Sequence, residues 1–309
     1  MSTKKRFGEE TLRIEDLKPV VRRRMSFIEF SLNWEGRVGR PQLQEQFDIS
    51  PQQATLDLNA YIDIFPNQMS YDPRQKAYIP NPGFRPRIIS EKSSEYLTRL
   101  EALTRGYQDA ATSWIQSPPA TEFVAVRPRA ISREILFQVL FAIQNKVSLK
   151  ARYVSLASES ESERTLLPHA LASDGHRWHC RCFDVDKERY SDFVLSRLEF
   201  ARADDRVEVQ QPPDTVWDTF VDVLLCVDTN SINGSPDSKA RQKHRLEHEY
   251  GMENETLKLT VRQALLFYYL RNLGFSPGRT SSGHMRNESS FHLKIKNLET
   301  VEDALNWRS

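Results

Sequence analysis

Polar side chains that could bind an anion gather in the middle of the chain, on segments with the alternation of β-strands. In the stretch RWHCRCFD, a strand would place His179 and Arg181 on the face opposite the two cysteines. Neighbouring strand-like segments add similar groups, and the full candidate set is Tyr153, Ser155, His169, His179, Arg181 and Arg197. Because arginine binds carboxylate and phosphate through two parallel hydrogen bonds, the set predicts a site for an anionic ligand. The alternative is a structural patch in which the arginines pair with Asp192 or Glu199.

The same residues also allow an enzymatic interpretation, in which the protein processes a nucleotide or RNA. His179 would then act as a base while Arg181 holds a phosphate. The sequence, however, has no paired carboxylates, G-x-S-x-G elbow or glycine-rich phosphate loop beside these residues. We therefore expect a protein that is not an enzyme. A non-catalytic adaptor that binds RNA or a nucleotide on this face is a further alternative.

One short motif matches a metal site by spacing alone. The sequence HRLEH, from His244 to His248, has the H-x-x-E-H pattern of an inverted zinc-protease motif. It lies inside the charged segment SKARQKHRLEHEY, which offers no obvious third ligand and is typical of a solvated helix. The sequence CRC also lacks the C-x-x-C spacing of zinc sites. We expect neither a metal nor another cofactor.

A second set of side chains, near the N-terminus, has the chemistry needed to recognise DNA bases. In the stretch FDISPQQATLDLNAY, Ser50 can cap a helix whose first residue is a proline. Helical spacing gives this helix an apolar inner face, which consists of Ala54, Leu58 and Tyr61. The amide and hydroxyl side chains toward the opposite face are Gln52, Thr55 and Asn59. Glutamine and asparagine can bond adenine bidentately in the major groove, which explains these residue types.

The elements around this helix have the order of a winged helix-turn-helix domain. A short helix in GRPQLQEQF precedes it, and the turn DIS joins the two helices. An earlier helix lies in RRRMSFIEFSLNWEG, with Phe27, Ile28 and Leu32 directed inward. The later segment FPNQMSYDPRQKAYIP has the turn chemistry of a β-hairpin wing. The alternative is a three-helix packing domain whose polar helix face is simply solvated.

Contacts with DNA phosphates require cations, which occur on either side of the predicted recognition helix. The candidate DNA-binding residues are Arg22, Arg23, Arg24, Arg40, Ser50, Gln52, Gln53, Thr55, Asn59, Arg74 and Lys76. Residues 1–90 contain 14 Lys and Arg against 11 Asp and Glu, which gives a net charge of +3. This charge is modest for a DNA-binding surface, so we expect a dimer that doubles the phosphate contacts.

Proline-rich breaks divide the chain into four parts. The predicted parts are an N-terminal DNA-binding domain at 1–88, a helical linker at 89–125, a strand-rich domain at 126–207, and a last domain at 208–309. In the linker, Leu97, Leu100 and Leu103 recur at helical spacing. The last domain alternates strands and helices, as in a small α+β sandwich. The predicted fold class is therefore α+β and multidomain.

The overall composition is that of a globular protein. Of the 309 residues, 39% are hydrophobic and 28% are charged, and no stretch approaches the ~20 apolar residues of a membrane helix. The first residues, MSTKKRFGEE, lack the apolar core of a secretory signal. The three cysteines form no disulfide framework. We expect a cytoplasmic protein with no membrane partner.

Several of these motifs, in this order, resemble one family of bacterial regulators. They are FIEFSLNWEGRVGR and FDISPQQATLDL near the start, RWHCRCFD and FVLSRL in the middle, and YGM, VRQALLFYYLRNLGF and FHLKIKN near the end. Nearly the whole chain resembles the WYL-domain transcriptional regulators, in particular the BrxR and CapW group that guards phage-defence islands. The tripeptide that gives the WYL domain its name is replaced here by Trp178, His179 and Cys180.

The resemblance implies both a fold and a function. It implies a winged helix-turn-helix, a central Sm- or SH3-like β-barrel WYL domain that carries the six-residue anionic site, and a C-terminal α/β dimerisation extension called WCX. The implied function is sequence-specific repression of a phage-defence operon, BREX or CBASS-like, by a homodimer. Its partners would be a pseudo-palindromic double-stranded DNA operator, a second copy of the chain, and a nucleotide or nucleic-acid fragment as effector.

Overall fold

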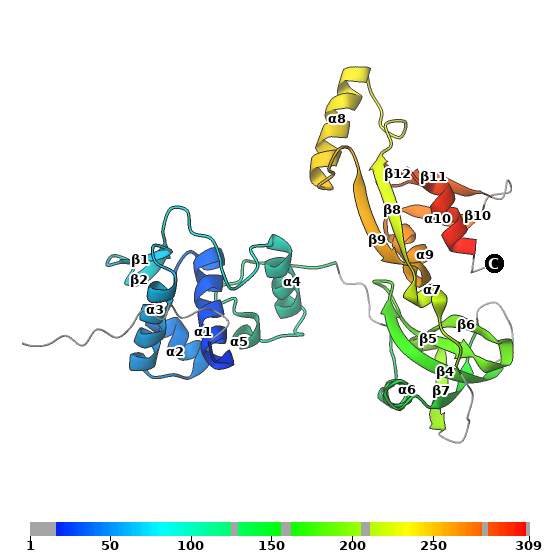
Figure 1. Ribbon diagram of the computed structural model, residues 1–309, viewed down its shortest axis with the longest axis horizontal. Coiled ribbons are helices and arrows are strands. Elements are labelled where there is room, and N and C mark those ends of the chain that lie inside the picture. The colour runs from blue at the N-terminus through cyan, green and yellow to red at the C-terminus, as the bar shows by residue number, and fades with distance from the viewer. Residues whose placement is uncertain (1–16, 125–128, 156–161, 205–210, 280–283, 307–309) are drawn as a thin grey trace, which may run out of the picture. The chain divides into compact units, whose positions relative to one another are not determined.

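The computed structural model describes residues 17–124, 129–155, 162–204, 211–279 and 284–306. The chain forms two units, Met1–Ala125 and Val126–Ser309, which are described separately (Figure 1). The first unit is mainly helical and carries one small hairpin. The second contains a five-stranded sheet, followed by a three-stranded sheet with its own helices.

Three helices build the first unit, as the sequence predicted. They are α1 (Pro19–Phe30), which continues into a π-helical turn at Ser31–Glu35, α2 (Arg40–Phe47) and α3 (Pro51–Ile64). The residues expected on the inner faces of the first and third helices are all buried in one apolar core, and they are Phe27, Ile28, Leu32, Ala54, Leu58 and Tyr61. Asp48 ends α2 in the left-handed conformation, and Ser50 then caps α3. The helix-turn-helix prediction is confirmed.

The predicted wing is also present. Strands β1 (Met69–Asp72) and β2 (Ala77–Pro80) form an antiparallel hairpin. The hairpin is attached to the segment before α2 through a two-residue bridge, in which Val38 and Tyr78 exchange backbone hydrogen bonds of 2.9 and 2.8 Å. This bridge holds the wing beside the start of α2.

The helical segment that follows the wing packs against the same core as the three helices. Helix α4 (Ser93–Thr104) buries Leu100, and the short helix α5 (Ala110–Ser113) leads to the buried Ile115. Leu103 packs against the core from outside, whereas Leu97 is 59% exposed and does not contribute. Residues 93–115, within the segment predicted as a linker, therefore pack with the first unit.

A five-stranded antiparallel sheet dominates the first part of the second unit, with strand order β6-β5-β4-β3-β7. Helix α6 (Arg133–Asn145), capped by Ser132, packs its inner face against this sheet. The strands are β3 (Ser148–Tyr153), β4 (Ser162–Ser173), β5 (Trp178–Asp184), β6 (Arg189–Val194) and β7 (Leu198–Asp204). Single 3-10 turns precede β6 at Val185–Lys187 and follow it at Leu195–Arg197.

The C-terminal part combines a three-stranded sheet, of order β12-β8-β9, with a separate β10–β11 hairpin. Its elements are α7 (Thr215–Asp218), β8 (Phe220–Val227), α8 (Pro236–Glu249), β9 (Leu257–Arg262), α9 (Leu266–Asn272), β10 (Phe275–Arg279), β11 (Met285–Ser289), β12 (Leu293–Ile295) and α10 (Leu298–Leu305). A 3-10 turn at Gln263–Leu265 joins β9 to α9. The predicted alternation of strands and helices is found in this part, whereas the β10–β11 hairpin and α10 were not predicted.

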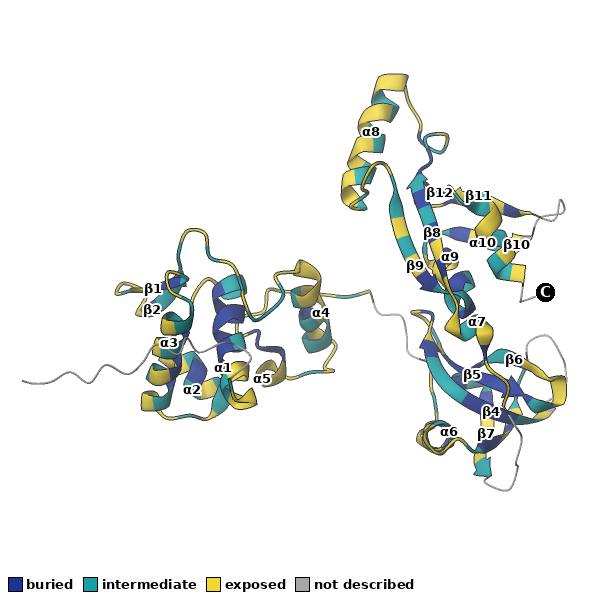
Figure 2. Cartoon of the chain, in the orientation of Figure 1, coloured by how far each residue is buried: buried dark blue, intermediate teal, exposed yellow. Residues whose placement is uncertain are grey.

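Helix α8 contains the HRLEH motif and is the most exposed helix of this part. The structure describes it along its whole length, and no residue in it is buried (Figure 2). No group of three or more metal-binding side chains occurs among the described residues of the chain. The exposure of α8 along its length agrees with the predicted solvated helix. None of the described helices combines the length and apolarity needed to cross a bilayer.

Candidate functional sites

The outer face of α3 carries amide side chains that form no hydrogen bonds with the described residues. Gln52 and Asn59 are exposed, and among the described residues neither side chain makes a hydrogen bond. The backbone amide of Gln53 donates to the Ser50 hydroxyl at 3.2 Å, so the capping role expected of Ser50 is confirmed. A capped, rigid helix with two free amides is suited to reading hydrogen-bonding groups on base edges.

Two other candidate DNA-binding residues of α3 make side-chain hydrogen bonds within the protein. The Thr55 hydroxyl donates to the backbone carbonyl of Pro51 at 2.9 Å. The Gln53 amide donates to the Asp57 carboxylate at 3.0 Å. Sequence reasoning missed Leu56, which is 61% exposed and lies one turn after Gln52 on the outer face. Its spacing of four from Gln52 and three from Asn59 is the signal that could have revealed it.

Arg24 does not lie where the sequence placed it. It was expected beside Arg22 and Arg23 as a phosphate contact, but it is only 8% exposed. Its guanidinium binds the Asp57 carboxylate bidentately, with Nε to Oδ2 at 2.6 Å and Nη2 to Oδ1 at 3.0 Å. The helical periodicity of α1 turns Arg24 toward α3, while Arg22 and Arg23 remain exposed. Arg24 therefore orients α3 and cannot reach a phosphate.

A groove lies between the wing and the two helices of the helix-turn-helix. It has a volume of about 570 Å³, and its lining includes Arg40, Thr55, Tyr71 and Lys76. The structure thus brings together two of the predicted cations, one from the start of α2 and one from the wing. Arg74 is exposed in the wing turn, where its backbone amide donates to Asp72 at 2.8 Å.

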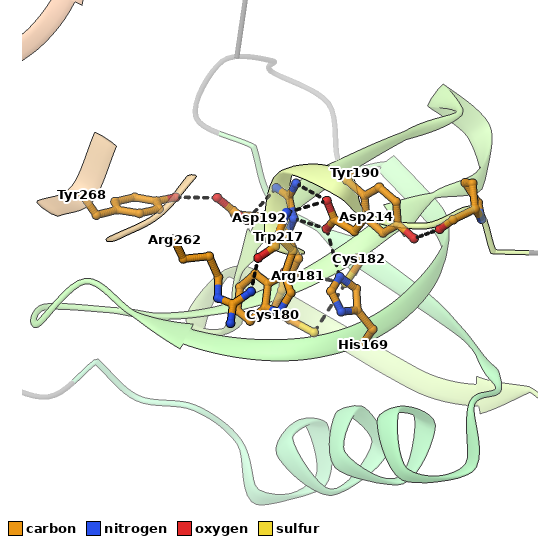
Figure 3. A network of polar contacts seen from close by, with 11 residues as sticks. His169, Cys180, Arg181, Cys182, Tyr190, Asp192, Asp214, Trp217, Arg262 and Tyr268 are labelled. Atoms are coloured by element: carbon orange, nitrogen blue, oxygen red, sulfur yellow. Dashed lines mark hydrogen bonds and ion pairs between the residues drawn. The ribbon is translucent and has the colours of Figure 1, made fainter. Parts of the chain in front are cut away.

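In the second unit, Arg181 is buried rather than open to a ligand. It is 1% exposed, and its Nη1 donates to Asp192 on β6 at 3.0 Å (Figure 3). Its Nε and Nη2 bind Asp214, at 2.7 and 3.2 Å. The structural alternative, pairing with Asp192, therefore describes Arg181 better than an open clamp does. Sequence reasoning missed Asp214, because it lies in one of the proline-rich breaks that divide the predicted parts of the chain.

The two histidines of the predicted site bind different carboxylates. His169 contacts Asp214, with Nε2 and Oδ2 3.0 Å apart, and His179 contacts Asp174 at 3.1 Å. Burial acts to raise the pKa of Asp174, but hydrogen bonds from the backbone of His176 and from His179 outweigh it and lower that pKa to about 2. At Asp214, burial is likewise outweighed by His169 and Arg181, which hold its pKa well below the usual range.

Tyr153 lies on the opposite face of the sheet from Arg181. Its ring packs edge-on against Phe193 and joins the apolar core that contains both cysteines of β5. Its hydroxyl accepts a hydrogen bond from the backbone amide of Val194 at 3.4 Å. Ser155 and Arg197 are half-buried near this edge of the domain, where the Arg197 carbonyl accepts a backbone bond from Val154 at 3.0 Å. The six predicted residues therefore do not form one shared face, because β3 presents Tyr153 to the core.

An open pocket nevertheless borders the buried arginine. It has a volume of about 380 Å³, and its lining includes Arg181, Arg189, Asp192, Asp214 and Tyr268. Arg189, at the start of β6, is exposed and was not selected from the sequence. Tyr268 comes from α9 in the C-terminal part of the unit.

Tyr268 connects the two parts of the second unit. Its hydroxyl donates to Asp192 Oδ2 at 3.1 Å, and its ring lies 4.8 Å from that of His179. Within the C-terminal part, the Arg262 guanidinium of β9 donates to the Trp217 carbonyl of α7 (Figure 3), and the Trp217 backbone amide donates to Asp214 Oδ1 at 3.1 Å. The polar network around Arg181 thus joins the five-stranded sheet to the helices and strands that follow it.

Three protein-family models match the chain. The BrxR transcriptional regulator winged helix-turn-helix domain matches residues 20–102, and the WYL domain matches residues 134–203. The BrxR transcriptional regulator C-terminal dimerization domain matches residues 232–301. The three models follow the order of the helical unit, the five-stranded sheet and the C-terminal part.

Curated relatives match over almost their full length. A protein named DNA-binding transcriptional repressor CapW, from Stenotrophomonas maltophilia, is 31% identical over 91% of this chain and 90% of its own length. The repressor of the same name from Escherichia coli is 30% identical over 90% of each chain. That from Pseudomonas aeruginosa is 28% identical over 92% of each.

One solved structure, proteasome accessory factor B/C (PafBC) of Arthrobacter aurescens, aligns with 93% of this chain at 14% identity. This chain spans 45% of that protein, and the TM-score is 0.30, which is too low to carry a structural argument.

Proposed function

We propose a function from one premise: the chain belongs to the BrxR and CapW family of DNA-binding transcriptional repressors. The protein binds a specific double-stranded operator as a homodimer and represses transcription from it. The observation that carries this proposal is the outer face of α3, where exposed Gln52 and Asn59 make no hydrogen bonds among the described residues. In a folded protein, buried polar side chains form hydrogen bonds with one another. A surface that recognises DNA bases instead keeps its hydrogen-bond donors and acceptors available.

The geometry suggests how each group would act on DNA. Helix α3 would enter the major groove, where the Gln52 and Asn59 amides can each bond an adenine edge. Arg22, Arg40 and Lys76 are exposed around it and would contact phosphates. Arg24 would act indirectly, because its ion pair with Asp57 fixes the angle of α3 against α1.

The small positive charge of the first unit favours binding as a pair of subunits. Two copies held together through residues 232–301 would double the phosphate contacts and present two recognition helices. A two-fold axis would then require a pseudo-palindromic operator, with half-sites one helical turn apart or a multiple of it.

Footprinting on the DNA upstream of the gene, followed by fluorescence anisotropy with the protected sequence, tests this proposal. We expect Gln52→Ala to weaken specific binding by about 1–3 kcal/mol and to relax the base preference at one position. Gln144→Ala, at an exposed glutamine of α6, is the matched control and should bind like the wild type. Equal affinity of the wild type for all duplex sequences would contradict the proposal.

We propose further that the second unit senses an anionic effector, such as a nucleotide or nucleic-acid fragment, in the pocket beside Arg189. Arg181 is already neutralised by two carboxylates, so it is poorly placed to attract an anion from solution. The exposed guanidinium of Arg189 can do so, and a ligand there would compete with Asp192 for Tyr268. His179 is buried and bound to Asp174, so we assign it no catalytic role.

An effector regulates DNA binding only if it binds the two conformations of the repressor unequally. Titration of nucleotides and short oligonucleotides into the labelled operator complex would reveal such a ligand as a change in anisotropy. Arg189→Ala should abolish the response while leaving operator affinity intact. Arg202→Ala, at an exposed arginine of β7, is the control. A response that survives Arg189→Ala would place the effector site elsewhere.

We also propose that the repressed genes encode phage defence, of the BREX or CBASS-like kind, because this is what the resemblance of the sequence motifs to the BrxR and CapW group implies. Sequencing the neighbourhood of the gene tests this directly. Neighbouring genes without any defence function would overturn the assignment and leave the repressor function unchanged.

A further inference from the structure

One large apolar side chain, Leu56, is exposed in the middle of the amide-bearing face of α3. Leu56 is 61% exposed and does not belong to the apolar core of the first unit. The other large aliphatic residues of α3, Leu58, Ile62 and Ile64, are buried in that core or packed against it. Leu56 lies instead between Gln52, four residues earlier, and Asn59, three residues later. This spacing places all three side chains on one outer stripe.

We infer that Leu56 is a specificity-determining residue that contacts the C5-methyl group of a thymine in the operator. The inference rests on the proposed function and deepens it. In the major groove, the thymine methyl is the one apolar feature that distinguishes a base pair, and an apolar side chain is its natural partner. Leu56 is such an apolar side chain, and it is exposed on the same helix face as the hydrogen-bonding amides.

The dimensions of the stripe indicate the sequence that it reads. Gln52 and Asn59 are seven residues apart, which is about 10 Å along a helix and comparable to about three base-pair steps. The amides at its two ends bond adenine edges, and Leu56 lies between them. We therefore expect the core of each half-site to be rich in A·T pairs, with one thymine methyl facing Leu56.

Replacing thymine by deoxyuridine removes only the methyl group and keeps every hydrogen-bonding atom. We would substitute each thymine of the footprinted half-site in turn and measure operator affinity by anisotropy. Wild-type protein should lose about fourfold in affinity at one thymine per half-site, which corresponds to one methyl group left without an apolar contact. Leu56→Ala should bind the unmodified operator more weakly and show no further loss with deoxyuridine at that position.

Two variants control the experiment. Leu97→Ala, at a similarly exposed leucine of α4, should keep the wild-type response to deoxyuridine. Leu56→Met retains an apolar side chain and should restore sensitivity to the methyl group. Because Leu56 is outside the core, both of its variants should unfold at the wild-type temperature in circular dichroism.

The outcomes separate this inference from the function on which it rests. Sequence-specific binding that depends on Gln52 but tolerates deoxyuridine everywhere would overturn the role of Leu56 alone. A weaker dimer in Leu56→Ala, seen by sedimentation together with unchanged sensitivity to deoxyuridine, would assign Leu56 to a protein contact and overturn it equally. Loss of all sequence preference in the wild type would overturn both.

Discussion

The two units each contain a buried arginine that the sequence suggested would face an anion, and the two arginines differ in what they hold. Arg24 binds one carboxylate, Asp57, within a single helical core. Arg181 binds two, Asp192 and Asp214, which come from a neighbouring strand and from the segment before α7. Through Asp192, the network around Arg181 also includes Tyr268 in the C-terminal part.

The difference indicates two ways in which a repressor can use an internal charge. The Arg24 pair joins α1 to the inner face of α3, and the outer face of α3 remains exposed. The Arg181 network spans the contact between a sheet and the elements that follow it. A ligand that disturbs this network would change how those parts pack, which is the kind of change that an effector needs to produce.

The largest expected effect is the loss of Arg181. Arg181→Met would leave Asp192 and Asp214 buried without their cation, and we expect the free energy of unfolding of the second unit to fall by about 3–5 kcal/mol. Urea unfolding of the full chain, with hydrogen exchange to assign each transition, would measure it. Arg189→Met, in the exposed arginine of the same pocket, should cost little. A similar loss in both variants would contradict the structural role of Arg181.

Removing Arg24 should have a smaller effect, confined to the first unit. Arg24→Met leaves only Asp57 without its cation, and the Gln53 amide still donates to that carboxylate. We expect a loss of about 3 kcal/mol in the stability of the first unit, together with weaker operator binding as α3 loses its fixed angle. Arg23→Met is the matched control, since it should weaken DNA binding without affecting stability. Unchanged hydrogen exchange in α1 and α3 of Arg24→Met would contradict this role.

Acid should lower the stability of the second unit, because two of its carboxylates have lowered pKa values. The folded pKa of Asp174 is about 2, and that of Asp214 is also below its unfolded value. Their stabilisation is therefore complete above about pH 4 and is lost as the pH falls toward 2, with roughly 2 kcal/mol from Asp174 alone. Hydrogen exchange as a function of pH would show this loss in β5 and α7. In Asp174→Asn, the remaining acid dependence should be smaller, and an unchanged dependence would contradict the assignment.

The comparison also shows which features the sequence could predict. The inner face of α3, the Ser50 cap and the wing depend on residues a few positions apart, and all three were predicted correctly. Asp57 and Asp214 each lie 33 residues from the arginine that they bind, so no local pattern joins those pairs. The β10–β11 hairpin was missed because its stretch contains a proline and few apolar residues, and therefore lacks the alternation of a strand.

For the candidate sites, the exposure of each side chain was harder to predict than the helix or strand face on which it lies. Periodicity identified the outer face of α3, but it assigned Leu56 no role because an apolar residue there fits neither a core nor an amide stripe. At β5, alternation correctly separated Arg181 from the cysteines. It could not show that Asp214 and Tyr268 cover that face, since both come from segments outside the sheet.

The smallest expected effect tests whether the polar network around Arg181 transmits the effector signal or only stabilises the fold. Tyr268→Phe removes the hydrogen bond to Asp192 but keeps the ring beside His179, so stability should fall by only about 1 kcal/mol. Operator affinity should be unchanged, because α3 and its ion pair belong to the other unit. If the network carries the signal, the effector concentration needed for half-maximal change in operator anisotropy should nevertheless shift in this variant. Tyr269→Phe, at the exposed neighbouring residue of α9, is the control. An effector response equal to that of the wild type would restrict the network to a structural role, like that of Arg24.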